Sequence, residues 1–470
     1  MKKTGAILFI AIFLLMALAP AAGMLIFGPA EPAAKEYLAL PPSLTDGEGK
    51  FNQRVLNDTS DYLSDRFWLR QELITANAVL EAAVFDESAS PKVVLGREGW
   101  LFYAETLDSY QGQNQLSARQ LWAAAHSLRL IRDYALSQGA ETWFIPVPNK
   151  NSVYGEYMPK SADKTQDQSD YDRLLDACRA EGVAVVDLLE PFLDKKKEVQ
   201  LYQRLDSHWN NLGAALANDL ILDAIQQSAV KTGAEKLRQI GGAERAFDPT
   251  GFQAVRDHVP DLYTMLYPAG TERDLQYEAL REPRFSYVRP IRTTEDLRIN
   301  TSCETGNGAL LMFRDSFGNT LHSFLAEDFA EACFSRLMPY DLRLFEAAHP
   351  DVLLLEITER HLSWLAKRPP ILPAPIQNLE QSVARTGETI PVTAEEDETG
   401  FFRVSGELAM NPDTCSPVWI EADGTVYEAS PVGETERSFT AYLPQPARTI
   451  RVLCLTGGEL CASPTELVTP

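Results

Sequence analysis

The sequence lacks an excess of positive charge. Its 470 residues include 43 Lys and Arg against 66 Asp and Glu, which gives a formal net charge of −23 at pH 7. Proteins that bind nucleic acids carry clustered basic residues that neutralise phosphates. The composition therefore excludes a nucleic-acid partner. The chain length and an apolar fraction of 45% predict two or three domains with cores of their own.

Cysteine is also scarce, with six residues and no Cys-x-x-Cys pair. A zinc or redox centre built on cysteine is therefore not indicated, and no cofactor is predicted. Cys178 lies in a helical pattern and is expected to be a plain buried thiol. Near the C-terminus, a disulfide between Cys415 and either Cys454 or Cys461 is an open expectation.

The N-terminus carries a long apolar segment. Two lysines precede an uncharged run over residues 4–28. At about 1.5 Å per residue this run can cross a hydrocarbon core of about 30 Å, and the positive flank keeps the short N-terminus cytoplasmic. Residues 1–29 are predicted to be a membrane anchor. A cleaved signal peptide stays open, because a typical cleavage sequence ends at Ala19, although Pro20 follows. Both alternatives place the rest of the chain outside the cytoplasm, either tethered or secreted.

The composition changes along the rest of the chain. Residues 30–50 are rich in Pro and Ala and predict an extended linker. Over residues 51–365, amphipathic helices alternate with apolar runs, which predicts a three-layer α/β domain with a mainly parallel sheet. Its clearest strands are expected at 141–148, 183–189, 308–315 and 351–360. A Pro-rich linker at 366–380 then leads to a small all-β, sandwich-like domain at 381–470.

Two polar segments stand at the ends of elements in this pattern. An Asp-Ser-His segment at 206–208 directly precedes a helix predicted at 211–227, for which Asn210 or Asn211 is the cap. Ser316 follows an apolar strand. In open α/β sheets, binding and catalytic residues lie on loops at the carboxyl ends of strands. The two segments are therefore expected to meet in one site.

The residue types in these segments predict nucleophilic acyl chemistry. Ser316 attacks an acyl carbon only if a base removes its proton, and His208 is the candidate base. Asp206, two residues before it, points the same way in an extended segment and can fix the imidazole tautomer. Asp-x-His spacing also suits a metal site, but no further ligand cluster stands nearby in the sequence, so no metal is predicted. A core histidine beside Trp209 is the remaining alternative.

Further residues are candidates for weaker roles. The Ser316 N–H is a natural oxyanion donor, because charge develops beside the nucleophile. Asn149 and Lys150, which follow the first predicted strand, and Gly318, which follows the nucleophile, are candidate oxyanion or substrate-binding residues. Other polar residues near these segments receive no assigned role: Tyr103, Arg204, Asp315, His258 and His322.

Four blocks of the sequence resemble the SGNH-hydrolase-like family that includes alginate O-acetyltransferases, often called DHHW-motif proteins. In the family's order, these blocks are GREGWLFY, PVPNKNSVYGEYMP, LDSHWNNLGA and LLMFRDSFGN. The resemblance covers roughly residues 50–365. It implies a flavodoxin-like sheet with a circularly permuted motif order, in which the Asp-x-His segment precedes the serine.

The same resemblance implies Ser316 as nucleophile, His208 as base and Asp206 as the orienting acid. Arg314 departs from the small or apolar residue usual before Asp-Ser in the family, and Leu205 and Asn210 stand where Thr is more usual. None of these departures removes a catalytic group.

The resemblance also implies an activity. It is the transfer of acetyl groups, through an acyl-Ser316 intermediate, onto hydroxyls of a cell-surface or secreted polysaccharide. Because acetyl-CoA is absent outside the cell, a membrane-bound O-acyltransferase partner is expected to deliver the acetyl groups. A polysaccharide acetyl esterase and a non-catalytic, polysaccharide-binding envelope scaffold are the alternatives. For 381–470, glycan or partner binding and a purely structural role both stay open.

Overall fold

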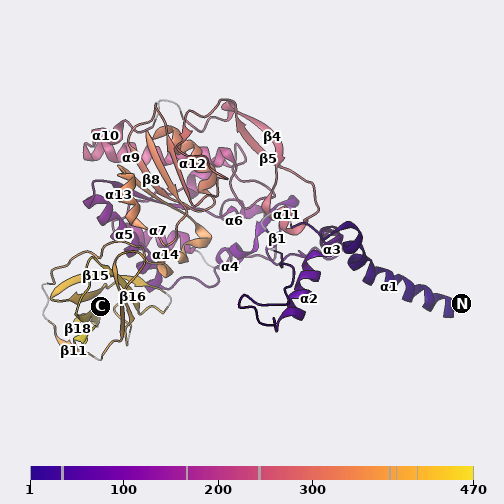
Figure 1. Cartoon of the computed structure of the whole chain (residues 1–470). Coiled ribbons are helices and arrows are strands. Elements are labelled where there is room, and N and C mark those ends of the chain that lie inside the picture. Colours follow the sequence, from indigo (N-terminus) through magenta and orange to yellow (C-terminus); the bar gives the residue numbers. More distant parts are fainter. Residues whose placement is uncertain are drawn as a thin grey trace.

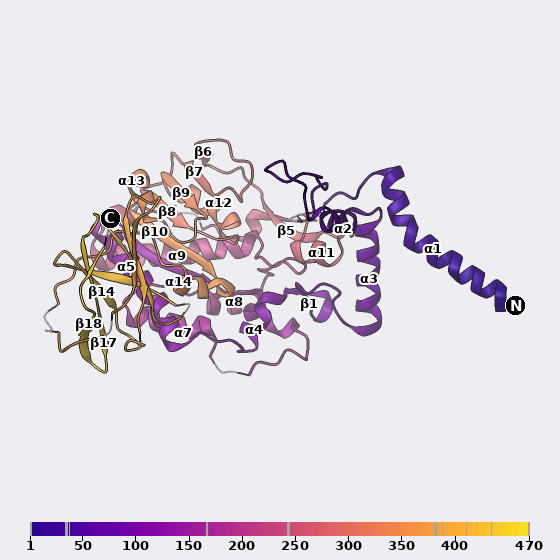
Figure 2. The same cartoon turned by 60° about the horizontal axis from the view of Figure 1, so that its bottom comes forward.

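The computed structural model of the chain describes residues 2–32, 36, 38–165, 168–241, 245–379, 383–387, 389–409, 411–433 and 435–468. Helix α1 (Lys2–Phe27) projects away from the rest of the molecule (Figures 1 and 2). Its Gly5–Phe27 segment has a mean hydropathy of 2.5, and no other helix in the described part is long and apolar enough to cross a membrane. A signal sequence meets the same criteria, so anchor and leader both remain compatible with this helix.

A six-stranded sheet forms the centre of the molecule, with strand order β3-β10-β8-β9-β7-β6. In that order the strands are Glu141–Val147, Val352–Thr358, Ala309–Phe313, Glu331–Ser335, Arg298–Ser302 and Ser286–Tyr287. The first four are mutually parallel, whereas β7 runs antiparallel to both of its neighbours. The sheet is therefore mixed, with a parallel core and an antiparallel edge.

Helices cover both faces of this sheet (Figures 1 and 2). On β8, Leu310 and Met312 pack into one buried cluster and Leu311 and Phe313 into another, as alternation along a strand requires. The first cluster contains α9 (Asn211–Thr232) and α12 (Gly318–Asp328). The second contains α5 (Ala118–Ser137) and α7 (Asp170–Ala180).

The helix starts follow local capping chemistry. Ser117 and Ser169 form capping boxes at the starts of α5 and α7. Of the two candidate caps for α9, Asn210 is the one used, and its Oδ1 accepts a hydrogen bond of 3.0 Å from the Gly213 N–H. These helices begin where short polar side chains satisfy the first free N–H groups.

The strand predicted at 183–189 does not form. Only Val185 makes a bridge, a parallel one to Phe144 on β3. The chain then turns at once into α8 (Leu189–Lys195), because Asp187 Oδ1 accepts a hydrogen bond of 3.1 Å from the Leu189 N–H. The apolar run thus pairs with the sheet edge at a single point, and Val183, Val186 and Leu188 are buried without a ladder.

Between α9 and the sheet's later strands lies an insertion with no clear sequence pattern. Strand β4 (Phe252–His258) and strand β5 (Asp274–Ala279) form an antiparallel hairpin, and α11 (Asp261–Leu266) connects them. Most residues of β4 are exposed on both faces, so the alternation that signals a half-buried strand is missing. The remaining shorter elements are α2 (Val55–Arg66), α3 (Arg70–Phe85), β1 (Val93–Leu95), β2 (Leu101–Tyr103), α4 (Leu107–Tyr110), α6 (Lys150–Val153), α10 (Glu235–Arg238), α13 (Phe345–Ala348) and α14 (Ser363–Lys367).

The C-terminal region is all-β. A nine-stranded sheet has the order β11-β18-β17-β14-β15-β16-β13-β12, with β19 paired to β17. The first half of β15 pairs with β14 and its second half with β16, so one strand joins two halves that enclose a common apolar core. In chain order the strands are Arg385–Thr386, Val392–Glu396, Phe402–Glu407, Val418–Ala422, Thr425–Val432, Ser438–Leu443, Thr449–Thr456, Glu459–Ala462 and Glu466–Leu467.

This region is joined closely to the α/β part. The Pro-rich stretch predicted as a linker hydrogen-bonds to the C-terminal strands, for example from the Ala374 N–H to the Tyr442 carbonyl. The Arg119 side chain on α5 donates hydrogen bonds to three carbonyls just before β14. Cys415, in the same loop, is exposed and forms no disulfide in the described chain, so the predicted Cys415 bridge is not seen. Cys178 is buried, as predicted.

Candidate active site

The turn after β8 presents the candidate nucleophile. The chain leaves β8 at Phe313 and enters α12 at Gly318, with Ser316 between them. A Cβ on Gly318 would lie 2.6 Å from Arg314 Cβ and 3.0 Å from Glu356 Oε2, so only glycine fits this close approach. Gly318 therefore shapes the turn. The Ser316 N–H makes no hydrogen bond within the described part of the chain, which leaves it available to a ligand.

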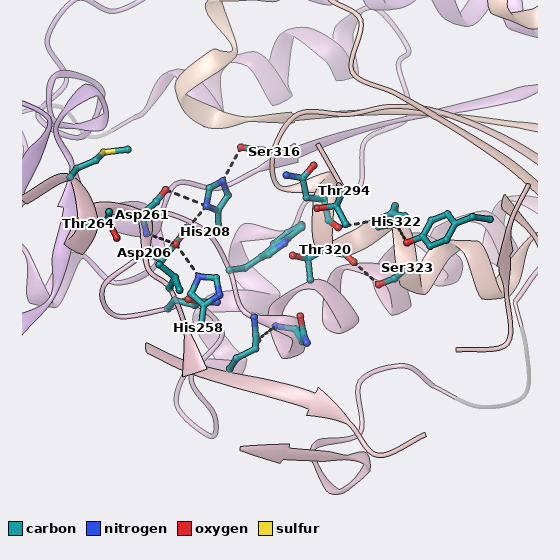
Figure 3. Close-up of a pocket in the computed structure, with 18 residues that line it drawn as sticks. Asp206, His208, His258, Asp261, Thr264, Thr294, Ser316, Thr320, His322 and Ser323 are labelled. Carbon is teal, nitrogen blue, oxygen red and sulfur yellow. Dashed lines mark hydrogen bonds and ion pairs between the residues drawn. The ribbon is translucent and has the colours of Figure 1, made fainter. Parts of the chain in front are cut away.

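The candidate base approaches from the loop before α9. His208 Nε2 lies 2.8 Å from Ser316 Oγ, and His208 Nδ1 lies 2.8 Å from Asp206 Oδ1. The same carboxylate oxygen accepts a hydrogen bond of 2.9 Å from the His208 N–H, which fixes the imidazole against its own loop. The three side chains thus stand in the order serine, histidine, aspartate (Figure 3). A proton on Nδ1 leaves Nε2 free to accept the serine proton.

Trp209 holds the two segments together. Its Nε1 donates a hydrogen bond of 3.2 Å to the Phe317 carbonyl, one residue past the serine. The Phe317 ring packs edge-on against the buried indole and lies 4.9 Å from the imidazole of His208. Trp209 is therefore a core aromatic that holds His208 close to Ser316, although 108 residues separate the two in sequence.

The second oxygen of Asp206 has partners that the sequence did not indicate. His258 Nε2, at the end of β4, lies 3.1 Å from Asp206 Oδ2, and the Asp261 N–H donates to the same oxygen at 2.8 Å. Burial opposes ionisation, but the hydrogen bonds and charges of His208 and His258 hold the pKa of Asp206 well below its usual range. Burial lowers the pKa of His258, but the Asp206 carboxylate outweighs this and raises it overall. Sequence spacing gave no signal, because the hairpin brings these residues in from far along the chain.

Asp261 adds a second carboxylate beside the imidazole. Its Oδ2 lies 3.5 Å from His208 Nδ1 and accepts a hydrogen bond of 2.6 Å from Ser207 Oγ. Burial and the neighbouring Asp206 charge raise the pKa of Asp261. Donor atoms of Asp206, His208 and Asp261 all lie within 4.8 Å of one another, close enough to surround a cation. Asp261 comes from another part of the chain, so the spacing in the sequence gave no sign of it as a third acidic or imidazole ligand. Nδ1 of His208 cannot bind a metal while it donates a proton to Asp206.

A second aspartate–histidine pair lies behind the nucleophile turn. Asp315 Oδ2 accepts hydrogen bonds from the backbone and the hydroxyl of Thr358 at the end of β10, and it lies 3.2 Å from His361 Nδ1. Asp315 Oδ1 accepts a hydrogen bond of 2.9 Å from the Phe317 N–H. Burial opposes its charge, but the His361 contact and nearby Arg360 hold the pKa of Asp315 well below its usual range. Asp315 therefore fixes the turn that carries Ser316.

Asn149 and Lys150 follow the end of β3, and the Lys150 side chain lies behind the Asp-Ser-His loop. The Lys150 ammonium donates to the carbonyls of Gln203, Arg204 and Asp206, at 2.7 to 3.1 Å, and burial lowers its pKa to about 7. This lysine supports the loop backbone and does not line the cleft described below. Asn149 is buried, and its Oδ1 accepts from the Arg360 N–H at 3.3 Å. An oxyanion role for Asn149 stays a prediction.

A cleft of about 450 Å³ opens in front of Ser316 (Figure 3). One wall is the exposed side of α12, and the other is formed by the β4–β5 hairpin and α11. The lining residues are Gln203, Asp206, His208, Trp209, Asn211, His258, Val259, Asp261, Thr264, Met265, Gln276, Tyr287, Thr294, Ser316, Asn319, Thr320, His322 and Ser323. The Ser316 side chain is therefore accessible from this cleft.

The chain is similar to several known proteins. Residues 93–251 match the family model of the SGNH hydrolase-like domain of the acetyltransferase AlgX. The probable alginate O-acetylase AlgJ of Pseudomonas putida is 30% identical over 156 residues, which are 33% of this chain and 39% of that protein. The probable alginate O-acetylase AlgJ of Pseudomonas syringae is 26% identical over 233 residues, 50% of this chain and 56% of that protein. The matches thus span less than two thirds of these relatives.

Two solved structures of bacterial proteins also align with this chain. The O-acetyltransferase domain of Pseudomonas putida AlgJ aligns at 23% identity with a TM-score of 0.39, over 58% of this chain and 93% of that one. Bacillus cereus PatB1 aligns at 15% identity with a TM-score of 0.44, over 57% of this chain and 96% of that one.

Proposed function

We propose, from the premise that residues 93–251 belong to the SGNH hydrolase-like domain family of the acetyltransferase AlgX, that this chain is a serine-dependent polysaccharide O-acetyltransferase. The observation that carries the proposal is the 2.8 Å contact between His208 Nε2 and Ser316 Oγ, with Asp206 bound to the other ring nitrogen. This arrangement suits acyl transfer, and the relatives described as probable alginate O-acetylases indicate acetyl as the acyl group.

The first half-reaction acylates the enzyme. Ser316 Oγ attacks the carbonyl carbon of an acetyl donor as its proton passes to His208 Nε2. The carbonyl oxygen becomes an oxyanion, for which the unpaired Ser316 N–H is a donor within the turn. The bond to the donor's leaving oxygen then breaks, His208 returns the proton to that oxygen, and the acetyl group stays on Ser316 as an ester.

The second half-reaction transfers the acetyl group to a sugar. His208 Nε2 accepts the proton of an acceptor hydroxyl, whose oxygen attacks the acetyl carbon of acyl-Ser316. Collapse of the second oxyanion intermediate breaks the bond to Ser316 Oγ, and His208 returns the proton to that oxygen. The Asp206 carboxylate, bound to Nδ1, stabilises the imidazolium in both halves. Water in place of the sugar hydroxyl gives hydrolysis by the same steps.

The proposal also includes the location and the supply of acetyl groups. The apolar helix α1 is the expected anchor, which puts the cleft outside the cytoplasm and beside the membrane. Acetyl groups must then come through a membrane protein, and a membrane-bound O-acyltransferase is the proposed donor partner. Asp206 and His208 both precede Ser316 in the chain, and this order is the basis for proposing a permuted motif order.

An acyl-enzyme experiment tests the proposal. The purified full chain in detergent is mixed with 4-nitrophenyl acetate, quenched, and digested for mass spectrometry, with Ser316→Ala as the matched control. An acetyl adduct on Ser316 in the wild type alone is the expected result. The adduct is then offered neutral oligosaccharides, and acetylated oligosaccharide supports transfer.

Two results argue against it. An adduct that releases only acetate, at a rate that no oligosaccharide changes, makes the protein an esterase. No adduct and no Ser316-dependent turnover leaves a non-catalytic, polysaccharide-binding role.

A chelator is added in parallel, because the Asp206, His208 and Asp261 cluster would make activity metal-dependent if it held a required ion.

A further inference from the structure

The walls of the cleft in front of Ser316 have an unusual charge pattern for a site that takes an anionic sugar. In the described chain, none of its lining residues is a lysine or arginine. The wall on α12 offers the amide of Asn319 and the hydroxyls of Thr320 and Ser323, and the facing wall offers Thr264 and Gln276. Side chains of this kind bind sugar hydroxyls, whereas carboxylates are normally held by guanidinium or ammonium groups.

The histidines of the cleft do not supply the missing positive charge. His322 Nδ1 donates to the Asn319 carbonyl at 2.8 Å, so Nε2 accepts from the Tyr287 hydroxyl at 3.1 Å. Burial lowers the pKa of His322 to about 4, which leaves it neutral near pH 7. His258 faces the Asp206 carboxylate, so any charge it carries is already paired.

The arginine behind the α12 wall does not face the cleft either. The Arg314 guanidinium donates to the side chain of Asn319 and to the carbonyls of Thr294 and Asp296. Its Nε is buried as well, so no edge of this group faces the cleft. Arg314 orients the Asn319 amide of the wall and is not a ligand for a substrate carboxylate.

The charges that do face the cleft are negative. Asp261 lies on the wall with 13% of its side chain exposed, next to the buried Asp206. The whole chain has a formal net charge of −23. A polymer with one carboxylate per sugar would meet repulsion on approach and find no cation on arrival.

We propose that the acceptor of this cleft is an uncharged polysaccharide, held through its hydroxyls, and not a polyuronate such as alginate. The inference rests on the acetyltransferase function proposed above and specifies its substrate class. It distinguishes this chain from relatives described as probable alginate O-acetylases. The acceptor hydroxyl would lie between the α12 wall and the β4–β5 hairpin, within reach of His208.

A matched pair of acceptors tests the proposal. β-1,4-linked mannose hexamers and β-1,4-linked mannuronate hexamers differ only at C6, where the second carries a carboxylate. The full-length protein, acetylated on Ser316 by 4-nitrophenyl acetate, is offered each hexamer, and acetylated product is measured by mass spectrometry. We expect kcat/KM for the neutral hexamer to exceed that for the uronate by about 100-fold at low salt. Added salt should narrow the gap by screening repulsion, with little change for the neutral hexamer.

A charge placed in the cleft sharpens the test. Ser323→Lys should raise kcat/KM for the mannuronate hexamer about tenfold. Ser137→Lys, at the exposed end of α5, changes the net charge equally and should leave both acceptors unaffected. A cationic glucosamine hexamer is the third arm, because Asp261 would favour it if its carboxylate were available to a ligand.

The outcomes separate this inference from the function on which it rests. If Ser316 forms no acetyl adduct, both fail together. If the adduct forms and the uronate or the glucosamine hexamer is acetylated as fast as the neutral one or faster, the neutral-acceptor proposal is overturned while the transferase function stands.

Discussion

Two aspartate–histidine pairs contact the segment around Ser316, and they differ in what surrounds the imidazole. In the first, His208 lies between Asp206 and the Ser316 hydroxyl and borders the cleft. In the second, His361 contacts Asp315, and its ring is stacked on Trp364 at 3.9 Å between centroids. No hydroxyl in the described chain contacts the other nitrogen of His361.

The difference teaches that a carboxylate–imidazole contact is not by itself a catalytic unit. The Asp315 carboxylate accepts hydrogen bonds from the Phe317 N–H and from Thr358, and both partners belong to the framework of the turn. Asp206 also accepts backbone hydrogen bonds, but its histidine keeps one nitrogen for a nucleophile. The first pair is arranged for proton transfer, and the second for holding the turn in place.

Removal of the first histidine should have the largest effect on the rate. In the proposed mechanism, His208→Ala deprives Ser316 of its base, so kcat for acetyl transfer should fall at least about 10³-fold. The fold should survive, because the imidazole is partly exposed and Trp209 still links the two segments. Steady-state kinetics and thermal melts of the two proteins check this. A loss of less than about tenfold would mean that His208 is not the base.

Whether a site residue could be predicted from the sequence depends on how far along the chain its contacts lie. Asp206 and His208 were identifiable because they lie two residues apart at a helix start, and Ser316 because it follows an apolar strand. His258 and Asp261 were not, because an irregular hairpin brings them to Asp206 from about fifty residues along the chain.

The fold was predictable to a similar extent. Helices α5, α7 and α9 start where their capping residues stand, since capping is local. The antiparallel edge strand β7 and the failed strand at 183–189 depend on which neighbours pair, and no local pattern specifies that. The role of Asp315 was likewise invisible, because its partners lie at the end of another strand.

The next largest effect is expected at His258, which joins the first pair from outside. His258→Gln keeps a donor for Asp206 but removes the ionisable group whose pKa the carboxylate raises. Loss of a positive charge beside the site favours protonation of the groups that remain, so the acidic limb of the pH–rate profile should move to higher pH. We expect kcat/KM at neutral pH to fall about three- to tenfold.

The pH profile separates this role from simple packing. His258→Ala, which removes the hydrogen bond as well, should lose more activity than His258→Gln at every pH. An acidic limb that stays in place in both variants would show that His258 only fills space.

In the second pair, His361→Ala should affect stability more than rate. Asp315 retains its hydrogen bonds to Phe317 and Thr358, so the Ser316 turn should persist and kcat should stay within about threefold. Loss of a charge-assisted contact should lower the free energy of unfolding by about 1–3 kcal/mol. Denaturant unfolding and steady-state kinetics on the same preparation measure both quantities. A rate loss like that of His208→Ala would make the two pairs equivalent and remove the distinction drawn above.

The smallest effect on rate is expected at Glu356, a carboxyl of β10 that underlies the second pair. Its side chain is 0% exposed, its Oε2 accepts from the Asp315 N–H at 2.9 Å, and its Oε1 has no partner in the described chain. Burial first, and then the Asp315 charge, raise the pKa of Glu356 well above its usual value, which favours the neutral acid in the folded protein. Glu356→Gln should therefore change kcat by less than about twofold.

The pH dependence of stability gives Glu356 its signature. A carboxyl whose pKa is raised on folding contributes stability in full below its unfolded pKa, about 4.3, and loses it as pH rises through the folded value. Glutamine does not titrate, so Glu356→Gln should gain stability relative to wild type as pH rises above about 4.3. Denaturant unfolding of both proteins at several pH values from acidic to mildly alkaline measures the difference. A difference that stays constant or falls across that range would mean that Glu356 is ionised in the folded protein. Two buried anions would then stand side by side behind Ser316, and the second pair could not be a simple structural support.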